Sequence, residues 1–203
     1  MIHALVGDRT EEDAKLFVRH LVGQLSAPPP LFTSDELRHY REALAVCYAD
    51  YVPVPKTGQQ GRPRRPIRQI DPQLLYATVH KERVNQRVVS VESRIIYGSP
   101  EAITKILTES AFSTSINTAG VERHNLNLRQ HSRRLIRKTN GFSKKRCNLE
   151  AQVLLVMAYY NFVLEHSSLK VKGQTGRTPA MATSLTDRPW TMRELLTYRI
   201  YDH

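Results

Sequence analysis

The sequence predicts an α/β fold, because segments with helical and strand-like apolar spacing alternate along its first half. Apolar residues recur with helical spacing from Ala14 to Leu25, and a short apolar strand at 31–33 follows a triple proline. Two stretches that alternate apolar and polar residues, 74–80 and 88–97, predict a β-hairpin. The order helix, strand, helix, strand, hairpin and long helix is typical of α/β proteins.

Each element of the first half has a local justification. Residues 1–7 have the apolar pattern expected at the end of a strand. Thr10 is a suitable N-cap for the first helix, and the acids that follow it favour the positive end of the helix dipole. Pro28–Pro30 ends this helix, because proline removes a helical hydrogen bond. A second helix from Glu36 and a short strand over 51–54 follow.

The second half is predicted to be mostly helical. A short helix covers 100–107, and a long helix capped by Asn117 or Thr118 continues until Gly141, where glycine favours a helix end. A second long helix, about 145–165, is mostly apolar and is expected to pack into the core.

Two further segments are defined by their local chemistry. The segment KTGQQGRPRRPIRQIDP (56–72) is rich in Gly, Pro and Arg. It is either a flexible solvated connector or a loop that orders on a nucleic-acid backbone. The tail has a turn at Pro179 and a short helix with a capping box formed by Thr191 and Glu194.

Composition favours an acidic partner in a reducing compartment. The 203 residues carry a formal net charge of +11, so nucleic acid is the first expectation. Cys47 and Cys147 share no CxxC motif, which favours two reduced thiols and a cytoplasmic location. The most apolar run, 151–164, is too short to cross a bilayer, and we expect no membrane partner.

The most informative stretch is the basic segment, residues 121–145, VERHNLNLRQHSRRLIRKTNGFSKK. It holds a single acid, Glu122, whereas a solvated helix face usually mixes both signs. Such unopposed positive charge is typical of a surface that contacts the phosphate backbone of nucleic acid. Its basic residues are Arg123, Arg129, Arg133, Arg134, Arg137, Lys138, Lys144 and Lys145.

Glu122 has two interpretations. On a helix, Arg129 and Arg133 would share its face, so it could form an exposed ion pair worth about 0–1 kcal/mol. Alternatively it is a metal ligand that works beside nucleic acid, which requires a second carboxylate. Asp35, at the end of the strand before the second helix, is the best candidate, although an Asp there is often a helix N-cap. Converging acids can hold Mg²⁺ for phosphodiester chemistry.

The run NTAGVERHNLNLRQHSRRLIRKTNGFSKK resembles the third-acid region of DDE-type bacterial insertion-sequence transposases, the insertion-sequence-one group in particular. The resemblance extends to VGDRTEEDAKLF, LFTSDELRHYREAL, YYNFVLEHSSL and RTPAMATSLTDRPWTMRELL, and so covers nearly the whole chain. It implies an RNase H-like, retroviral-integrase-like fold with a mixed five-stranded sheet flanked by helices. A triad of two Asp and one Glu binds two Mg²⁺ or Mn²⁺ ions in that family. Matched by motif, Asp35 corresponds to the second acid and Glu122 to the third.

The chain departs from the family at its start. The family's first acid lies on the first strand, upstream of the VGDRT-like motif, and neither Asp8 nor Asp13 replaces it. We therefore expect the C-terminal portion of a transposase that lacks this strand. Its expected domains are a partial RNase H-like catalytic domain at 1–166, with a basic loop and hairpin insertion at 56–100, and a C-terminal tail at 167–203.

The resemblance implies a role in DNA transposition and recombination, with metal-dependent strand cleavage and transfer. Lacking the first Asp, this chain is expected to be inactive as a polynucleotidyl transferase. The alternative is a non-catalytic DNA-binding remnant that competes with full-length transposase. The expected partners are DNA, at transposon ends and target, and a second copy or full-length transposase, with association to the nucleoid. RNA recognition is less favoured, because aromatic residues make up only 7% of the chain.

Overall fold

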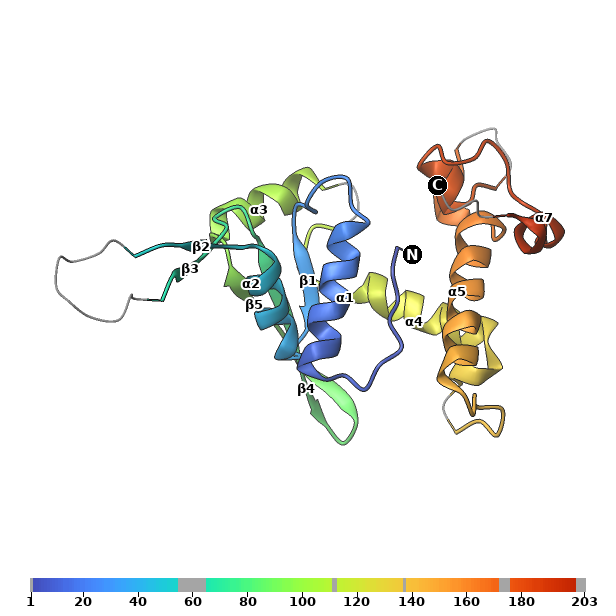
Figure 1. Ribbon diagram of the computed structural model, residues 1–203, viewed down its shortest axis with the longest axis horizontal. Helices are drawn as coiled ribbons and strands as arrows, with labels where there is room; N and C mark the ends of the chain where they lie inside the picture. The colour runs from blue at the N-terminus through green and yellow to red at the C-terminus, as the bar shows by residue number, and fades with distance from the viewer. Residues whose placement is uncertain (1, 55–64, 111–112, 137, 172–175, 200–203) are drawn as a thin grey trace. The chain divides into compact units, whose positions relative to one another are not determined.

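The computed structural model describes residues 2–54, 65–110, 113–136, 138–171 and 176–199, and the chain divides into two compact units (Figure 1). The sheet unit is Gly7–Val121, and the helical unit is Met1–Val6 together with Glu122–His203. The division expected at residue 166 follows family motifs rather than packing, and it stays a prediction.

The sheet unit is a mixed α/β structure built on three strands in the order β1-β4-β5. β1 pairs in parallel with β4, and β4 pairs antiparallel with β5, so a mixed sheet flanked by helices is confirmed. A separate antiparallel ribbon joins β2 and β3. The elements are α1 (Glu11–Gly23), β1 (Phe32–Asp35), α2 (His39–Cys47), β2 (Ala49–Val52), β3 (Ile67–Ile70), β4 (Tyr76–Val84), β5 (Arg87–Tyr97) and α3 (Pro100–Glu109).

The predicted cap of α1 is confirmed. The Thr10 hydroxyl accepts a hydrogen bond from the Asp13 backbone N–H at 3.1 Å, and the Asp13 carboxylate accepts one from the Thr10 N–H at 3.3 Å. This capping box satisfies two backbone donors that the first turn leaves without helical partners. The helix ends at Gly23, two residues before the expected position.

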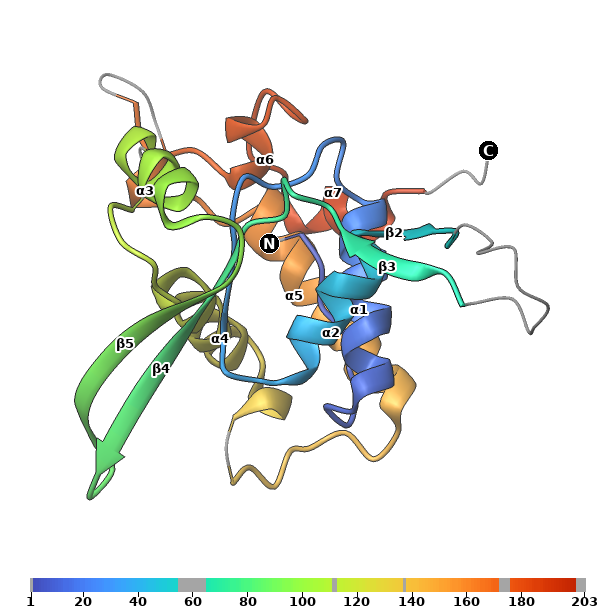
Figure 2. The same ribbon diagram turned by 90° about the vertical axis from the view of Figure 1, so that its left-hand side faces the viewer.

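The core of the sheet unit lies between the sheet and two helices. α1 and α2 lie side by side in both views of the ribbon (Figures 1 and 2). They bury small and branched side chains against Leu74 and Tyr76 from the sheet side. Tyr76 is only 1% exposed, and partly buried Phe32 and Tyr97 pack around the same cluster. The buried members are Ala14, Val18, Ala43, Leu44, Leu74 and Tyr76.

Two expectations for the first half of the chain are wrong. The structure assigns no strand to residues 2–10. Within the segment expected to be a loop, Ile67–Ile70 forms β3, because β2 offers it an antiparallel partner that local composition does not reveal. Arg68 on β3 also donates to the Glu42 carboxylate of α2 at 3.1 Å, which ties the ribbon to the helices. Residues 55–64 of that segment lie outside the described residues.

The predicted hairpin is confirmed, with a tighter turn than expected. Asn85 and Gln86 both have positive φ, 48° and 65°, as a two-residue type I′ turn requires. Gln86→Gly is expected to stabilise the sheet unit by about 0.5 kcal/mol, because glycine adopts positive φ without a Cβ clash but loses more chain entropy on folding. Urea denaturation measures this change in the free energy of unfolding. Glu82→Gly in β4, where φ is not positive, is expected to destabilise, and destabilisation by both variants would contradict the turn assignment.

The helical unit is built around one long helix, α5 (Arg146–Phe162), close to the predicted bounds. Only one face of α5 is buried, through residues such as Val153 and Tyr160, whereas Leu154 is 61% exposed. The helix therefore packs into the core of its unit through this face, as predicted, and its other face is exposed. The other elements are α4 (Ala119–His131), whose first three residues belong to the sheet unit, η1 (Arg133–Leu135), η2 (Ser167–Leu169), α6 (Pro179–Ala182) and α7 (Met192–Thr197).

α4 is shorter than predicted. It ends at His131, and Ser132 adopts an extended conformation with φ −140° and ψ 111°. Ser132 is buried, so tertiary packing rather than a local helix stop ends α4 ten residues before Gly141. As a consequence, Arg133 lies beyond the helix, and the expectation that it shares a helix face with Glu122 is wrong.

The predicted C-terminal helix is confirmed together with its capping box. The Thr191 hydroxyl accepts from the Glu194 N–H at 3.2 Å, and the Glu194 carboxylate accepts from the Thr191 N–H at 2.8 Å. Trp190 packs this helix onto α5, with its ring centroid 4.8 Å from that of Phe162.

The pKa of Glu194 gives a test of this cap. Hydrogen bonds from Arg188, which have the largest effect, and from Thr191 lower the pKa of Glu194 to about 2. Because the folded pKa is depressed, the cap contributes stability above the ordinary pKa of 4.5, and this contribution is lost as pH falls through about 2. A carboxyl ¹³C NMR titration is expected to show the low midpoint, and Arg188→Gln to raise it. A midpoint near 4.5 in the unaltered chain would rule out the cap.

Candidate nucleic-acid interface

α4 is held on α5 by histidine–tyrosine contacts. The His124 ring lies 5.1 Å from the Tyr160 ring at 80°, and the His131 ring lies 5.3 Å from that of Tyr159 at 60°. Histidines in so basic a run are expected to face solvent or phosphate. That expectation is wrong for His124, which is half-buried, and burial lowers its pKa. No local pattern around His124 indicates this role, since a histidine in a basic run is usually exposed.

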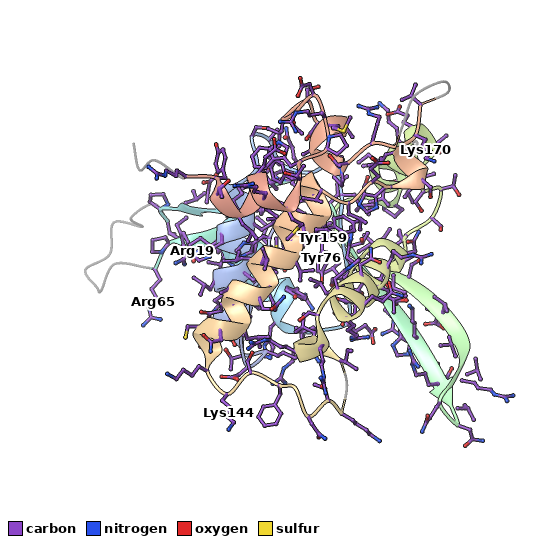
Figure 3. All side chains as sticks on the ribbon, turned by 90° about the vertical axis from the view of Figure 1, so that its right-hand side faces the viewer. Arg19, Arg65, Tyr76, Lys144, Tyr159 and Lys170 are labelled. Carbon is purple, nitrogen blue, oxygen red and sulfur yellow. The ribbon has the colours of Figure 1, made fainter. Side chains whose placement is uncertain are left out.

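The basic segment continues from α4 through η1 and an irregular stretch to the start of α5. Figure 3 shows Lys144 in this stretch, with its side chain directed away from the ribbon. Arg129 is half-buried, and Arg137 lies outside the described residues. The exposed cations are Arg123, Arg133, Arg134, Lys138, Lys144 and Lys145.

These six cations and Arg129 form no ion pair with any carboxylate in the described part of the chain. Some surface arginines outside the segment are paired with carboxylates. Arg94 contacts Glu36 at 3.1 Å, and Arg146, just after the segment, contacts Glu150 at 2.8 Å. The positive charge of the basic segment is thus left uncompensated, as a site for an external anion requires.

The irregular stretch is folded back on itself. The Arg134 guanidinium donates to the Ser143 hydroxyl at 2.7 Å, and the Thr139 hydroxyl accepts from the Gly141 N–H at 3.0 Å. A Cβ at Gly141 would lie 3.1 Å from the Arg133 Nε atom, so glycine leaves room for that side chain. Gly141 therefore positions a cation instead of ending α4. Gly141 was expected to be a helix end, and Ser143 was not singled out from the sequence, because the role of both residues depends on this fold-back.

The N-terminus of α5 adds to the same charge. Lys145 is its N-cap residue and makes no side-chain capping hydrogen bond. The first N–H groups of a helix carry partial positive charge and bind anions readily. Lys144 and Lys145 therefore stand beside a helix terminus whose dipole reinforces their attraction for phosphate.

Asp35 is exposed at the end of β1, in register with Val79 of β4. The N-cap position of α2 is held by Arg38, so Asp35 does not cap that helix. Burial, and then the nearby Asp35 carboxylate, raise the pKa of Tyr40. The neighbouring Glu36 is bound by His80 and Arg94, which leaves Asp35 as the carboxylate at this strand end that could take an external ligand.

Glu122 is exposed on the first turn of α4. The predicted pair of ligands therefore falls in different units, with Asp35 in the sheet unit and Glu122 in the helical unit. Among the described residues, no three His, Cys, Asp or Glu side chains gather into a group that could hold a metal ion. The residues of either unit alone do not fit a two-ion site, and the expected Mg²⁺ or Mn²⁺ ligands stay a prediction.

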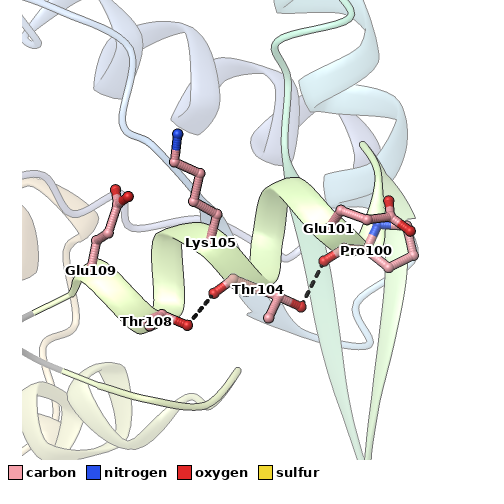
Figure 4. Close-up of a pocket in the computed structure, with 6 residues that line it drawn as sticks. All are labelled: Pro100, Glu101, Thr104, Lys105, Thr108 and Glu109. Carbon is pink, nitrogen blue, oxygen red and sulfur yellow. Dashed lines mark hydrogen bonds between the residues drawn. The ribbon is translucent and has the colours of Figure 1, made fainter.

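A shallow hollow on the surface of α3 is not a competing site (Figure 4). The hydroxyls of Thr104 and Thr108 face it, but they donate to the carbonyls of Pro100 and Thr104 at 2.8 and 2.9 Å. These hydroxyls are engaged by their own helix, so the hollow offers little polar chemistry to a ligand.

Comparison of the chain with family models, curated proteins and solved structures finds no match. Within the part of the chain that the structure describes, no helix combines the length and apolar character that a bilayer crossing needs.

Proposed function

We propose that this chain binds the phosphate backbone of DNA, without sequence preference, through the basic segment, as a member of the transposase family that its motifs resemble. The observation that carries the proposal is the uncompensated charge of seven cations between Arg123 and Lys145. Each cation that contacts a phosphate releases counterions, which makes affinity strongly salt-dependent.

Duplex DNA is a better partner for this surface than a single-stranded nucleic acid. Binding of single strands depends on aromatic side chains that stack on bases. The aromatics of the helical unit mostly stack on one another, as Tyr160 does with His166 at 4.3 Å and Trp190 with Tyr198 at 5.1 Å. Phe142 is exposed within the basic segment, and Phe142→Ala therefore separates stacking from backbone contact.

Binding of fluorescent duplexes of two unrelated sequences tests the proposal. The logarithm of affinity is expected to fall linearly with the logarithm of salt concentration, with a slope near −5 if about six phosphates are contacted. The two sequences are expected to bind equally within about threefold, and Phe142→Ala to bind like the unaltered chain. A slope near zero, or a strong preference for one sequence, would refute backbone binding.

The proposal includes an RNase H-like fold and strand cleavage, and both rest on the family resemblance alone. Asp35 and Glu122 are the proposed metal ligands, and a triad needs one more acid. We derive no catalytic step from two acids. The chain by itself is expected to bind DNA without cutting it, which also suits the second candidate, a regulatory protein that competes with full-length transposase. Strand cleavage by the purified chain with Mg²⁺ or Mn²⁺, abolished by Glu122→Gln, would overturn this expectation.

A further inference from the structure

β5 presents an open edge in the sheet unit. β4 occupies one side of it, and in the part of the chain that the structure describes no strand pairs with its other side. Edge strands usually carry proline, bulges or repelling charges, which prevent another strand from pairing with them. The stretch 90–95 has no proline, and the two register irregularities between β4 and β5 fall outside it. This stretch is therefore a regular template for another strand.

The two faces of this stretch differ in character. Val91 and Ile95 lie on the face of their β4 partners Lys81 and Ala77, and they are 59% and 39% exposed. Glu92 and Arg94 lie on the opposite face, with their side chains 59% and 55% exposed. The strand thus carries an apolar pair on one face and a pair of opposite charges on the other.

Self-pairing selects one register. When two copies pair antiparallel about a two-fold axis through Ser93, Glu92 of each copy stands opposite Arg94 of the other. On the other face, Val91 of each copy stands opposite Ile95. An axis through Glu92 or through Arg94 would instead place like charges together, which is unfavourable. An axis through Val91 would pair Glu92 with Ser90 and form no ion pair between the copies.

We propose that the chain forms a symmetric dimer by antiparallel pairing of β5 with β5 of a second copy, centred on Ser93. The charges that would ordinarily repel a strand at this edge are complementary to those of a second copy. Pairing about a two-fold axis closes the edge, so it yields dimers and not open-ended assemblies. The proposal does not rest on DNA binding, since β5 contains no residue of the basic segment.

Sedimentation equilibrium with single charge reversals tests the pairing. Glu92→Arg and Arg94→Glu are each expected to weaken the dimer at least about tenfold, because like charges then stand opposite each other twice. Mixed together, the two variants are expected to form a heterodimer, since every pair then joins opposite charges. Arg87→Glu, on the same strand outside 91–95, is the matched control and is expected to leave the dimer unchanged.

A cross-link supplies an independent measurement. Ser93→Cys, in a chain with Cys147→Ser, is expected to form an interchain disulfide on mild oxidation, because directly opposed Cβ atoms lie about 4.5–5.5 Å apart. Arg87→Cys in the same background is expected to cross-link at least tenfold more slowly. A chain that stays monomeric at about 200 µM, a dimer indifferent to both reversals, or open-ended assemblies would each overturn the proposal.

Discussion

A variant of the basic segment that lacks four cations is expected to bind duplex DNA about 4,000-fold more weakly than the unaltered chain at about 0.1 M salt. Each phosphate contact contributes about 0.9 to the slope of the logarithm of affinity against the logarithm of salt concentration. This corresponds to about an eightfold change in affinity between 1 M and 0.1 M salt. The slope itself is expected to fall by about 3.6. Fluorescence anisotropy across a salt series measures both. The four substitutions to glutamine are at Arg133, Arg134, Lys144 and Lys145.

A matched control separates this site from the general charge of the protein. It removes the same number of exposed cations at positions outside the basic segment, so the net charge of the two variants is equal. The control is expected to lose less than about tenfold in affinity, and its slope to stay within about 1 of the unaltered chain. Equal losses for the two variants would show that net charge, and not the basic segment, attracts DNA. The control substitutions to glutamine are at Arg83, Arg87, Lys105 and Arg193.

Tyr76→Ala is expected to destabilise the sheet unit by about 4 kcal/mol, since removing a large buried aromatic side chain leaves a cavity. Tyr76 is 1% exposed, and its ring centroid lies 6.2 Å from that of Tyr97. Its hydroxyl lies 2.7 Å from the Ser34 hydroxyl, beside Asp35. The same residue therefore supports the core and the end of β1, where the proposed ligand lies.

Tyr76→Phe is the matched control, because it keeps the ring and loses only the hydrogen bond. It is expected to cost about 1 kcal/mol. Hydrogen exchange of amides in α1 and β4 assigns the change to the sheet unit and not to the helical unit. If Tyr76→Phe destabilised the sheet unit as much as Tyr76→Ala, then the hydroxyl, and not the packing of the ring, would be the main contribution of Tyr76 to stability.

The elements predicted correctly are those with strong local signals. The caps at Thr10 and Thr191 need only residues three positions apart, and the hairpin needs only alternating strands around a short turn. β1 was found from its apolar pattern after a triple proline, and α5 was found from its apolar pattern. In each case the physical cause lies within a few residues of the element.

The elements predicted wrongly depend on distant partners. β3 forms because β2 pairs with it, and α4 ends where Ser132 becomes buried. His124 packs on Tyr160 from another helix, which no local pattern near His124 indicates. The same limit applies to Asp35 and Glu122. Each lies in a local sequence motif, but a metal site that both residues share would involve residues of two different units.

Hydrogen exchange of the chain with and without a duplex tests the location of DNA binding most directly. At low salt, amides of residues 132–146 are expected to exchange at least about tenfold more slowly in the complex, since phosphate contacts restrain the fold-back beside α5. Amides of β4 and β5 are expected to exchange unchanged. Protection confined to β4 and β5, with residues 132–146 unaffected, would contradict the assignment of DNA binding to the basic segment.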